Sequence, residues 1–381
     1  MNRIIEEDIN HIISSEIIDW ERFRNKSILI TGANGMLPSY MGLTLLYLNQ
    51  TSKMGLKLYA LARNEEKLKK VYSEYWDKEY FIPVIQDVCS SLPTEYKFDF
   101  IIHAASQASS KYFATDPVGT LKANTVGTIN TLDLAVKNNV EGYLYFSSGS
   151  VYGNYDGNGS SITEDSYGRI NPLLVRNCYA TSKVLGENAC VSYHHQYGLP
   201  TKMVRIFHTM GPLMQLNDSR IFSDLCQNIV NRENVVLHSD GSAMRAFCYV
   251  VDATIAYFKV LLDGEPATAY NVGGDERHEV SMKQLAEMLV AMYPERNLKV
   301  EYKIDSKDLV YGTMRSTVER KYPSLKRIES FGWKQLYDVP TMFKRSIDGI
   351  EFEHWGGAIY ELKRRSYNRA VNRYNIWRAA A

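Results

Sequence analysis

Ile28-Leu29-Ile30-Thr31-Gly32-Ala33-Asn34-Gly35-Met36 is the stretch that decides the fold of this 381-residue chain. An apolar run enters a turn that holds two glycines, and helix-forming residues follow from Met41 to Leu48. This order predicts a strand, a tight turn and a helix. Glycines let the main chain approach a pyrophosphate, and a helix N-terminus favours negative charge, so the stretch predicts a dinucleotide-binding turn.

Pro38 stands where the third glycine of this spacing would fall. Proline is tolerated in the first turn of a helix, so we expect the turn to form with altered packing of the helix against the strand. A surface turn that happens to contain two glycines is the alternative. The strand before the turn and the helix after it favour cofactor binding, with contacts from Gly32, Asn34, Gly35 and Met36.

Strand-like and helix-like segments alternate over the first 200 residues. Such alternation predicts an α/β fold with a parallel sheet wound by helices on both faces. Beyond Thr201 the pattern is mixed: residues 204–207 return to the sheet, whereas 218–231 and 281–292 are expected to be helices on the substrate side. The strands are expected near residues 27–31, 57–62, 81–85, 98–103 and 143–147.

Composition excludes several classes of function. The net charge of +1 gives no reason to expect nucleic acid as a partner, and 45% hydrophobic content allows a large core. The five cysteines form no Cys-x-x-Cys pair, which fits a reducing compartment and predicts no metal site. We expect no membrane span and no signal peptide, and therefore a cytoplasmic protein.

Tyr179 and Lys183 stand four residues apart in Cys178-Tyr179-Ala180-Thr181-Ser182-Lys183. That spacing places both side chains on one face of a helix, where the ammonium is expected to lower the pKa of the phenol. A phenol tuned in this way is a general acid or base for a hydroxyl or a carbonyl. Ser148 follows an apolar strand-like run, so its hydroxyl is expected at the carboxyl end of a strand, facing the crevice of the sheet.

Together these motifs resemble the extended short-chain dehydrogenases/reductases that act on nucleoside-diphosphate sugars. The resemblance covers roughly residues 26 to 350, and the segments 171–187 and 205–252 look closest to UDP-glucuronate decarboxylases. The motifs that carry it stand in the family's order: Thr31-Gly32-x-x-Gly35, His103-Ala104-Ala105-Ser106, Asn124-Thr125-Val126-Gly127-Thr128, Ser147-Ser148-x-x-Val151-Tyr152-Gly153, Tyr179-x-x-x-Lys183, Arg205-x-Phe207-His208-x-x-Gly211-Pro212, Arg245-x-x-x-Tyr249-x-x-Asp252 and Asn271-Val272-Gly273.

The resemblance implies a Rossmann-like doubly wound parallel sheet with an interleaved smaller C-terminal substrate domain. It implies Ser148 as catalytic hydroxyl, Tyr179 as acid/base and Lys183 as its electrostatic partner and ribose ligand. It further implies a homodimer. The remaining cofactor residues would be Arg63, Asp87, Val88, His103, Ala104, Ala105 and Asn124, and the substrate residues Ser148, Arg176, His208, Arg220 and Arg245, with a structural role for His208 as the alternative.

With the family as a guide, the chain divides into four parts. Residues 1–25 place isoleucines at helical spacing and predict an amphipathic helix docked on the main domain, with binding of a partner as the alternative. The NAD(P)-binding domain is expected at 26–200 and the substrate-binding part, interleaved with it, at 201–350. Residues 351–381 are expected to form a basic helical tail. This tail is expected to face solvent; contact with another subunit or with a membrane surface is the alternative.

The end of the second expected strand bears on the choice of cofactor. NAD enzymes of this fold usually carry a carboxylate there for the ribose 2′-hydroxyl, whereas a basic residue accommodates a 2′-phosphate. Here no carboxylate stands at the strand end and Arg63 follows at once. NADP(H) is therefore favoured and NAD remains possible. The alternative is that Arg63 is simply exposed to solvent.

The residues after Ser148 separate the possible reactions. Family dehydratases carry Asp-Glu where Gly149 and Ser150 stand, and the decarboxylases carry a glutamate at the second position. Without that carboxyl group the sequence favours an NADPH-dependent reductase of a 4-keto-6-deoxy sugar nucleotide, such as dTDP-4-dehydro-6-deoxyglucose, for surface polysaccharide synthesis. A UDP-sugar 4-epimerase with bound NAD, a UDP-glucuronate decarboxylase and a non-catalytic NADP(H)-sensing regulator are the alternatives.

Overall fold

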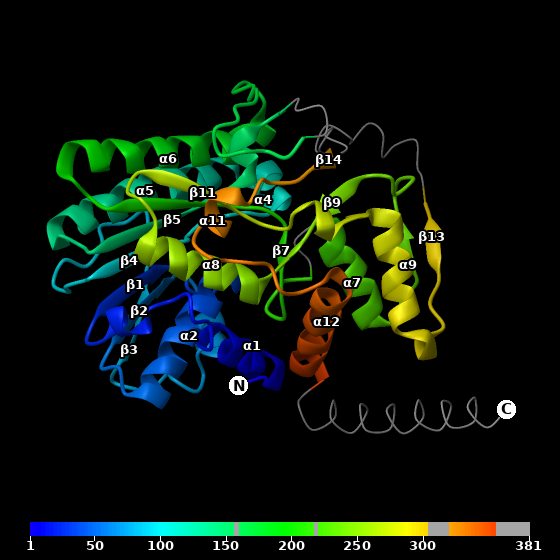
Figure 1. The fold of residues 1–381 in the computed structure, drawn as a ribbon, viewed down its shortest axis with the longest axis horizontal. Helices are drawn as coiled ribbons and strands as arrows, with labels where there is room; N and C mark the ends of the chain where they lie inside the picture. Colours follow the sequence, from blue (N-terminus) through cyan, green and yellow to red (C-terminus); the bar gives the residue numbers. More distant parts are fainter. Residues whose placement is uncertain (156–159, 217–219, 304–319, 356–381) are drawn as a thin grey trace.

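The computed structural model, which describes residues 1–155, 160–216, 220–303 and 320–355, is built around a seven-stranded parallel sheet (Figure 1). The strand order is β11-β6-β5-β4-β1-β2-β3. The chain winds outward in both directions from β1 and β4, so their carboxyl ends border the crevice where such sheets bind ligands. The strands are β1 (Ser27–Thr31), β2 (Lys57–Ala62), β3 (Phe81–Ile85), β4 (Phe100–His103), β5 (Gly142–Ser148), β6 (Thr201–Ile206) and β11 (Thr268–Val272).

Helices cover both faces of this sheet. On one face lie α5 (Pro117–Asn138) and α6 (Cys178–Tyr197), and on the other α2 (Met36–Ser52) and α8 (Val250–Asp263) (Figure 1). Successive strand residues point to opposite faces, so Ile28 and Ile30 join the core under α2 and α8, while Leu29 joins the core under α5 and α6. The doubly wound parallel sheet expected from the sequence is confirmed.

After β6 the chain alternates between the sheet and a second layer of helices. In this layer α7 (Ile221–Asn231), α9 (Met282–Met292) and α12 (Val339–Trp355) pack against one another. Short strands pair beside them: β7 (Thr209–Met210) with β10 (Cys248–Tyr249), β9 (Met244–Ala246) with β12 (Glu279–Ser281) and β14 (Arg320–Lys321), and β8 (Val235–Leu237) with β13 (Val300–Tyr302).

The helices expected at 218–231 and 281–292 correspond to α7 and α9. Residues 217–219 lie outside the described residues, and α9 begins after a capping box formed by Ser281 and Gln284. Most of the expected basic tail, residues 356–381, also lies outside the described residues.

The remaining elements are α3 (Glu65–Val71), α4 (Ser110–Thr115), α11 (Lys326–Glu329) and the 3-10 turns η1 (Trp20–Phe23), η2 (Gly149–Tyr152), η3 (Val175–Asn177), η4 (Glu276–His278) and η5 (Pro294–Arg296).

The N-terminal helix α1 (Arg3–Ile13) docks against α2, α8 and α12. Its isoleucines Ile5, Ile9 and Ile12 are buried, as the helical spacing predicts. Asp8 lies on the same buried face and is fully enclosed. An isolated carboxylate in such a place is unfavourable, so Asp8 requires partners from the helices around it.

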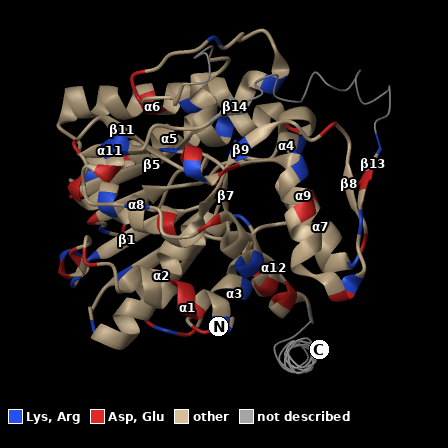
Figure 2. Ribbon diagram, turned by 45° about the vertical axis from the view of Figure 1, so that its right-hand side comes forward, with Lys and Arg blue, Asp and Glu red and all other residues tan. Residues whose placement is uncertain are grey.

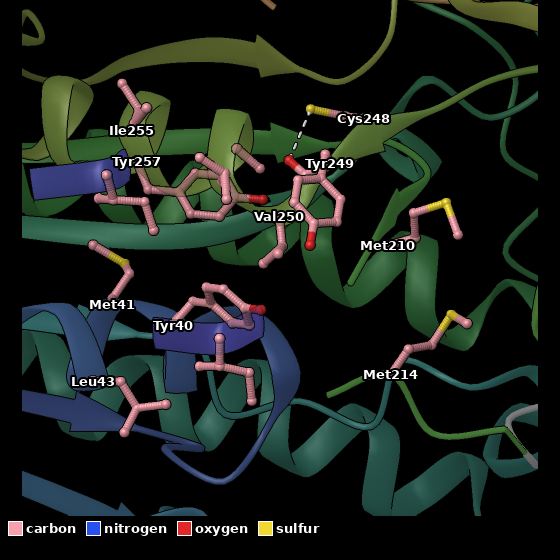
Figure 3. Close-up of a cluster of buried hydrophobic side chains, with 14 of the residues drawn as sticks. Tyr40, Met41, Leu43, Met210, Met214, Cys248, Tyr249, Val250, Ile255 and Tyr257 are labelled. Carbon is pink, nitrogen blue, oxygen red and sulfur yellow. Dashed lines mark hydrogen bonds between the residues drawn. The ribbon is translucent and has the colours of Figure 1, made fainter. Parts of the chain in front are cut away.

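Those partners come from three distant parts of the chain. The hydroxyls of Tyr40 and Tyr249 donate to Oδ2 of Asp8 at 2.8 and 2.7 Å, and the Arg345 guanidinium donates twice to Oδ1, at 3.0 and 2.7 Å. Figure 3 shows the two tyrosines within one buried cluster, and Figure 2 shows the acidic residues of α1 beside the basic part of α12. Burial raises the pKa of Asp8 and the Arg345 charge opposes that rise. Asp8 therefore ties the helix of the glycine turn to the second layer.

Replacing Asp8 tests this contact. We expect Asp8→Ala to lower the free energy of unfolding by about 3–5 kcal/mol, because it removes the shared acceptor of two buried hydroxyls and of the half-buried Arg345 guanidinium. Glu7→Gln is the control, because Glu7 pairs with Arg345 and Arg3 at the surface and should cost less than about 1 kcal/mol. Urea unfolding followed by circular dichroism measures both. Equal losses for the two variants would contradict a special role for Asp8.

Candidate active site

The glycine turn joins β1 to α2 as the sequence predicts. Gly32 has φ +66°, and a Cβ on it would lie 2.7 Å from Cα of Ala105, so only glycine fits there. The amide of Gly35 donates to the carbonyl of Gly32 at 2.9 Å and closes the turn. Gly35 caps α2 without a side-chain bond, and Met36 is the first helical residue. The first amides of α2 therefore remain available for an anion, which suits a diphosphate.

Pro38 lies buried in the first turn of α2 and leaves the turn intact. The close approach of helix to neighbour occurs instead at Gly42, where a Cβ would lie 2.3 Å from the hydroxyl of Tyr72. That hydroxyl donates to the carbonyl of Ala33 at 3.0 Å and so holds the turn from behind. Tyr72 was not found from the sequence, although a glycine inside a helix is the kind of signal that marks a close contact.

His103, at the end of β4, is buried and bonded at both ring nitrogens. Thr31 Oγ1 accepts from the amides of Ala104 and Ala105 at 3.2 Å, so its own proton goes to Nδ1 of His103 at 2.8 Å. Nε2 of His103 then donates to Thr128 at 3.0 Å. Burial, followed by the Lys183 charge, lowers the pKa of His103 to about 3, so the ring is neutral. Any cofactor contact from His103 would therefore come from its main chain.

Asn124, on α5, braces α6 beside Tyr179. Its Nδ2 donates to Ser182 Oγ at 3.0 Å, and the Ser182 hydroxyl donates to the main-chain oxygen of Tyr179 at 2.9 Å. Oδ1 of Asn124 is buried with no partner among the described residues. An orphaned buried acceptor beside the crevice fits a site made to receive a polar ligand or a water. Ser182 is a further residue that the sequence analysis missed.

Ser148 and Tyr179 meet at the carboxyl end of β5. The Ser148 side chain lies close enough to the phenol of Tyr179 to lower the pKa of that phenol, and the Ser148 oxygen accepts from the amide of Ser150 at 3.1 Å. Its hydroxyl also lies 3.2 Å from that of Ser150. The ring of Phe113 stacks on Tyr179 with centroids 4.8 Å apart and planes at 18°. Phe113 comes from α4 and was not found from the sequence.

The electrostatics of Tyr179 differ from the sequence expectation. Burial raises the pKa of Tyr179, while the Ser148 hydrogen bond and the Arg220 charge lower it less. The expected lowering of that pKa by Lys183 is therefore wrong for this geometry, because burial dominates. The phenol is protonated near neutral pH, which is the form able to donate a proton.

Lys183 is buried one helical turn beyond Tyr179. Its ammonium donates to the main-chain oxygen of Phe146 at 2.7 Å and lies 5.8 Å from the centroid of the Tyr179 ring. Burial lowers the pKa of Lys183 to about 7, against the opposing charge of Glu187. A lysine near this balance changes its charge in response to small changes in its surroundings.

Arg63 and Asp87 lie at the carboxyl ends of the neighbouring strands β2 and β3. The Arg63 guanidinium is 62% exposed and lies 3.8 Å from the Asp87 carboxylate. The amide of Cys89 donates to Asp87 at 2.8 Å, and this bond, with the Arg63 charge, lowers the pKa of Asp87. Val88 is buried against Gly127 of α5. Both charges therefore stand at the rim where an adenosine would lie in this fold.

The expected substrate residues come from the second layer. Arg220 precedes α7 and lies over the Phe222 ring at 5.0 Å, close enough to Tyr179 to act on its pKa. The His208 ring lies 6.0 Å from the rings of both Phe222 and Phe247, so aromatic packing fixes its place. Arg245 is on β9, where burial lowers its pKa. Arg176 is in η3, just before α6.

The structure therefore brings Ser148, Tyr179, Lys183 and Arg220 together at one end of the sheet. Arg63 and Asp87 form a separate cluster at the rim. Among the described residues no cluster of three or more metal-binding side chains occurs, and no helix is long and apolar enough to cross a membrane.

Relatives with assigned activities resemble the chain over most of its length. UDP-glucuronic acid decarboxylase 6 of Arabidopsis thaliana is 30% identical over 310 residues, which cover 81% of this chain and 84% of the relative. UDP-glucuronic acid decarboxylase 1 of Danio rerio is 32% identical over 336 residues, which cover 86% of this chain and 74% of the relative. Both matches reach across the sheet and the second layer.

Solved structures share the fold at lower identity. A dTDP-glucose 4,6-dehydratase from Bacillus anthracis in complex with NAD has a TM-score of 0.70 at 19% identity, covering 86% of this chain and 97% of that one. A UDP-glucuronic acid 4-epimerase from Bacillus cereus, in complex with UDP-glucuronic acid and NAD, has a TM-score of 0.71 at 17% identity, with coverages of 85% and 99%. The family model for NAD dependent epimerases/dehydratases matches residues 28–273. The chain is therefore an enzyme of the NAD dependent epimerase/dehydratase family.

Proposed function

We propose that this enzyme transfers hydride at carbon 4 of a nucleoside-diphosphate sugar. The observation that carries the proposal is the meeting of Ser148 and Tyr179 at the carboxyl end of β5, with the Lys183 ammonium one helical turn away. The residues around them fit a dinucleotide: the turn at Gly32 leaves room that a Cβ would fill, and α2 begins without a side-chain cap. When bound, the nicotinamide cofactor supplies or accepts the hydride.

In this mechanism Tyr179 moves the proton at the sugar's O4 oxygen. For reduction of a ketone, its buried phenol donates the proton, and the Lys183 ammonium stabilises the phenolate that remains. The Ser148 hydroxyl, which lies beside that phenol, holds the reacting oxygen in line. Phe113 covers one face of the Tyr179 ring and limits the access of water. Arg220, Arg245, Arg176 and His208 are the side chains we assign to the diphosphate and sugar.

The residues next to Ser148 favour a reaction without elimination. Gly149 and Ser150 stand where a carboxyl group would be needed to move a proton from carbon 5, and the Ser150 side chain bonds only to Ser148 among the described contacts. Reduction of a 4-keto-6-deoxy sugar nucleotide by NADPH needs no such group. Within the proposed hydride transfer we therefore favour this reduction, and we propose that its product serves surface polysaccharide synthesis.

A 4-epimerase that retains NAD is the second candidate. The observation in its favour is the Arg63–Asp87 pair: a carboxylate 3.8 Å from the guanidinium competes with a 2′-phosphate for it. Two of the solved structures with the same fold also contain NAD. The similarity to UDP-glucuronic acid decarboxylases makes decarboxylation a third reaction to assay.

One set of assays separates these reactions. Purified protein is first denatured, and any released dinucleotide is identified by chromatography. The protein is then supplied with dTDP-4-keto-6-deoxyglucose and NADPH, with UDP-glucose, or with UDP-glucuronate. Consumption of NADPH with the keto sugar supports the reductase, whereas released NAD with conversion of UDP-glucose supports the epimerase. Carbon dioxide from UDP-glucuronate would overturn the reductase in favour of a decarboxylase, which also needs hydride removal at carbon 4. Dinucleotide binding without any turnover would overturn hydride transfer itself, in favour of a sensing regulator.

We also propose that the enzyme is a cytoplasmic homodimer that pairs through the outer faces of α5 and α6. These faces expose apolar side chains that a soluble surface rarely gathers in such number: Val118, Val126, Ile129, Val184, Leu185 and Val191. All five cysteines are free, which fits a reducing compartment. Sedimentation velocity of the wild type and of Leu185→Glu tests the dimer, which the added charge should dissociate. A monomeric wild type would contradict it.

Replacing Tyr179 tests the assigned proton donor. We expect Tyr179→Phe to lower kcat by about 10²–10⁴-fold while the fold and the affinity for cofactor stay nearly unchanged, because only the hydroxyl is lost. Tyr197→Phe, at an exposed position of the same helix, is the matched control and should be fully active. A Tyr179→Phe enzyme within a few-fold of wild type would remove Tyr179 from the mechanism. Ser148→Ala should lose less, and full activity there would point to Thr181 or Ser150.

The cofactor preference rests on Arg63. If its guanidinium pairs with a 2′-phosphate, Arg63→Ala should weaken NADPH binding by roughly 10- to 150-fold and leave NADH binding almost unchanged, since a charge-assisted hydrogen bond contributes about 1.5–3 kcal/mol. Lys122→Ala, which removes a nearby charge that also acts on Asp87, controls for general attraction. Fluorescence titration with both cofactors gives the affinities. Equal small effects would make Arg63 a surface residue, and tight NAD binding would favour the epimerase.

A further inference from the structure

Three side chains on one face of α6 make contact with three consecutive residues of β5. Tyr179 lies beside the side chain of Ser148, which lowers the pKa of the phenol. Lys183 donates to the main-chain oxygen of Phe146 at 2.7 Å, and Glu187 accepts from the hydroxyl of Ser147 at 2.5 Å. The first two contacts belong to the proposed machinery. The contact between Glu187 and Ser147 does not belong to it, although Ser147 lies between Phe146 and Ser148 on the strand.

Glu187 is itself held rigidly. Arg205, on the neighbouring strand β6, donates to both its carboxylate oxygens, at 2.9 and 2.7 Å, and both side chains are nearly enclosed, with 12% and 13% exposed. Arg205 also donates to the hydroxyl of Tyr152 at 2.9 Å and to the carbonyl of Glu164 at 2.7 Å. A fork-to-fork ion pair with further hydrogen bonds has little freedom to move. Glu187 is thus a fixed point between α6, β5 and β6.

The charges around Lys183 leave Glu187 as its main support. Glu187, on α6, favours the charged form of the lysine, whereas burial raises the pKa of the Cys190 thiol on the same helix and keeps it neutral. On β4, His103 is neutral, because its pKa is lowered to about 3, so it adds no charge. The groups that face the ammonium are the carbonyl of Phe146 and the rings of Tyr145 and Tyr179. Burial works against the ammonium, and the nearest described carboxylate on the same helix works for it.

We propose that Glu187, clamped by Arg205, is a positioning residue that aligns Tyr179 and Lys183 with the end of β5 and keeps the Lys183 ammonium charged. It touches neither substrate nor cofactor in this assignment and acts through its neighbours. The inference rests on the proposed function only in that Lys183 holds the ribose of the cofactor and supports the phenolate of Tyr179.

The test is the pH dependence of cofactor binding, which needs no substrate. In wild type, NADPH or NADH affinity should weaken as rising pH removes the Lys183 charge. Glu187→Gln keeps the size of the side chain but removes the carboxylate, so this weakening should move to lower pH by about one unit or more. Glu187→Asp keeps the charge but holds it farther from Lys183, because the side chain is shorter. The pH at which cofactor binding weakens should therefore move in the same direction but by less. If Glu187→Gln fails to fold, the shift of Glu187→Asp still decides.

Glu351→Gln is the matched control. Glu351 forms a similarly enclosed pair with Arg296, in which Nη1 lies 2.8 Å and Nη2 3.1 Å from the carboxylate, and it lies on α12, away from α6 (Figure 1). This variant should lose thermal stability without moving the pH at which cofactor binding weakens. A merely structural Glu187 would behave in the same way, so unmoved pH curves for both Glu187 variants would overturn the inference.

Measuring turnover distinguishes a wrong role for Glu187 from a wrong reaction at carbon 4. With an active sugar nucleotide, kcat of Glu187→Gln should fall by roughly 10- to 100-fold, and the loss should grow with pH. Shifted binding curves without turnover on any sugar nucleotide would sustain the role of Glu187 and defeat the carbon-4 assignment. Turnover together with unshifted binding curves would sustain the carbon-4 assignment and defeat the role of Glu187.

Discussion

A buried hydrogen bond from the Lys183 ammonium to the main-chain oxygen of Phe146, 2.7 Å long, fixes how α6 lies on the sheet. A charge enclosed in this way is tolerated only with a close acceptor, so the bond allows little play between helix and strand. This bond also sets the positions of Tyr179, one helical turn before Lys183, and of Glu187, one turn after it. The end of β5 and the face of α6 then act as one rigid unit, which is what precise proton transfer requires.

Burial sets the chemistry of this unit more than pairing does. It raises the pKa of Tyr179 and lowers that of Lys183 to about 7, so near neutral pH a neutral phenol and a lysine close to its own pKa face the crevice. That state suits donation of a proton to a developing alkoxide. It also means that a change of charge nearby, such as binding of an oxidised nicotinamide or loss of Glu187, would alter both groups together. The second layer contributes Arg220, and α1 joins the two halves through Asp8.

The sequence predicts what depends on local pattern. Five strands, the glycine turn, the docked isoleucines of α1 and the Tyr179–Lys183 face all follow from periodicity and spacing, because each is decided within a few turns of chain. Contacts between distant segments could not be read this way. Tyr72 reaches Ala33 across 39 residues, Phe113 stacks on Tyr179, and Arg205 grips Glu187 only because β6 lies beside β5. The burial that reverses the expected pKa of Tyr179 is likewise a property of the packed molecule.

Hydride transfer at carbon 4 of the sugar, with Tyr179 as proton donor, is the reaction that we propose for this enzyme. Its most direct test uses NADPH or NADH deuterated at the transferring carbon, with a 4-keto sugar nucleotide, and locates the label in the product by NMR. We expect deuterium at carbon 4 of the sugar, and we expect Tyr179→Phe to lose this incorporation. Product formed at the wild-type rate with no deuterium at carbon 4, or with the label at another carbon, would contradict it.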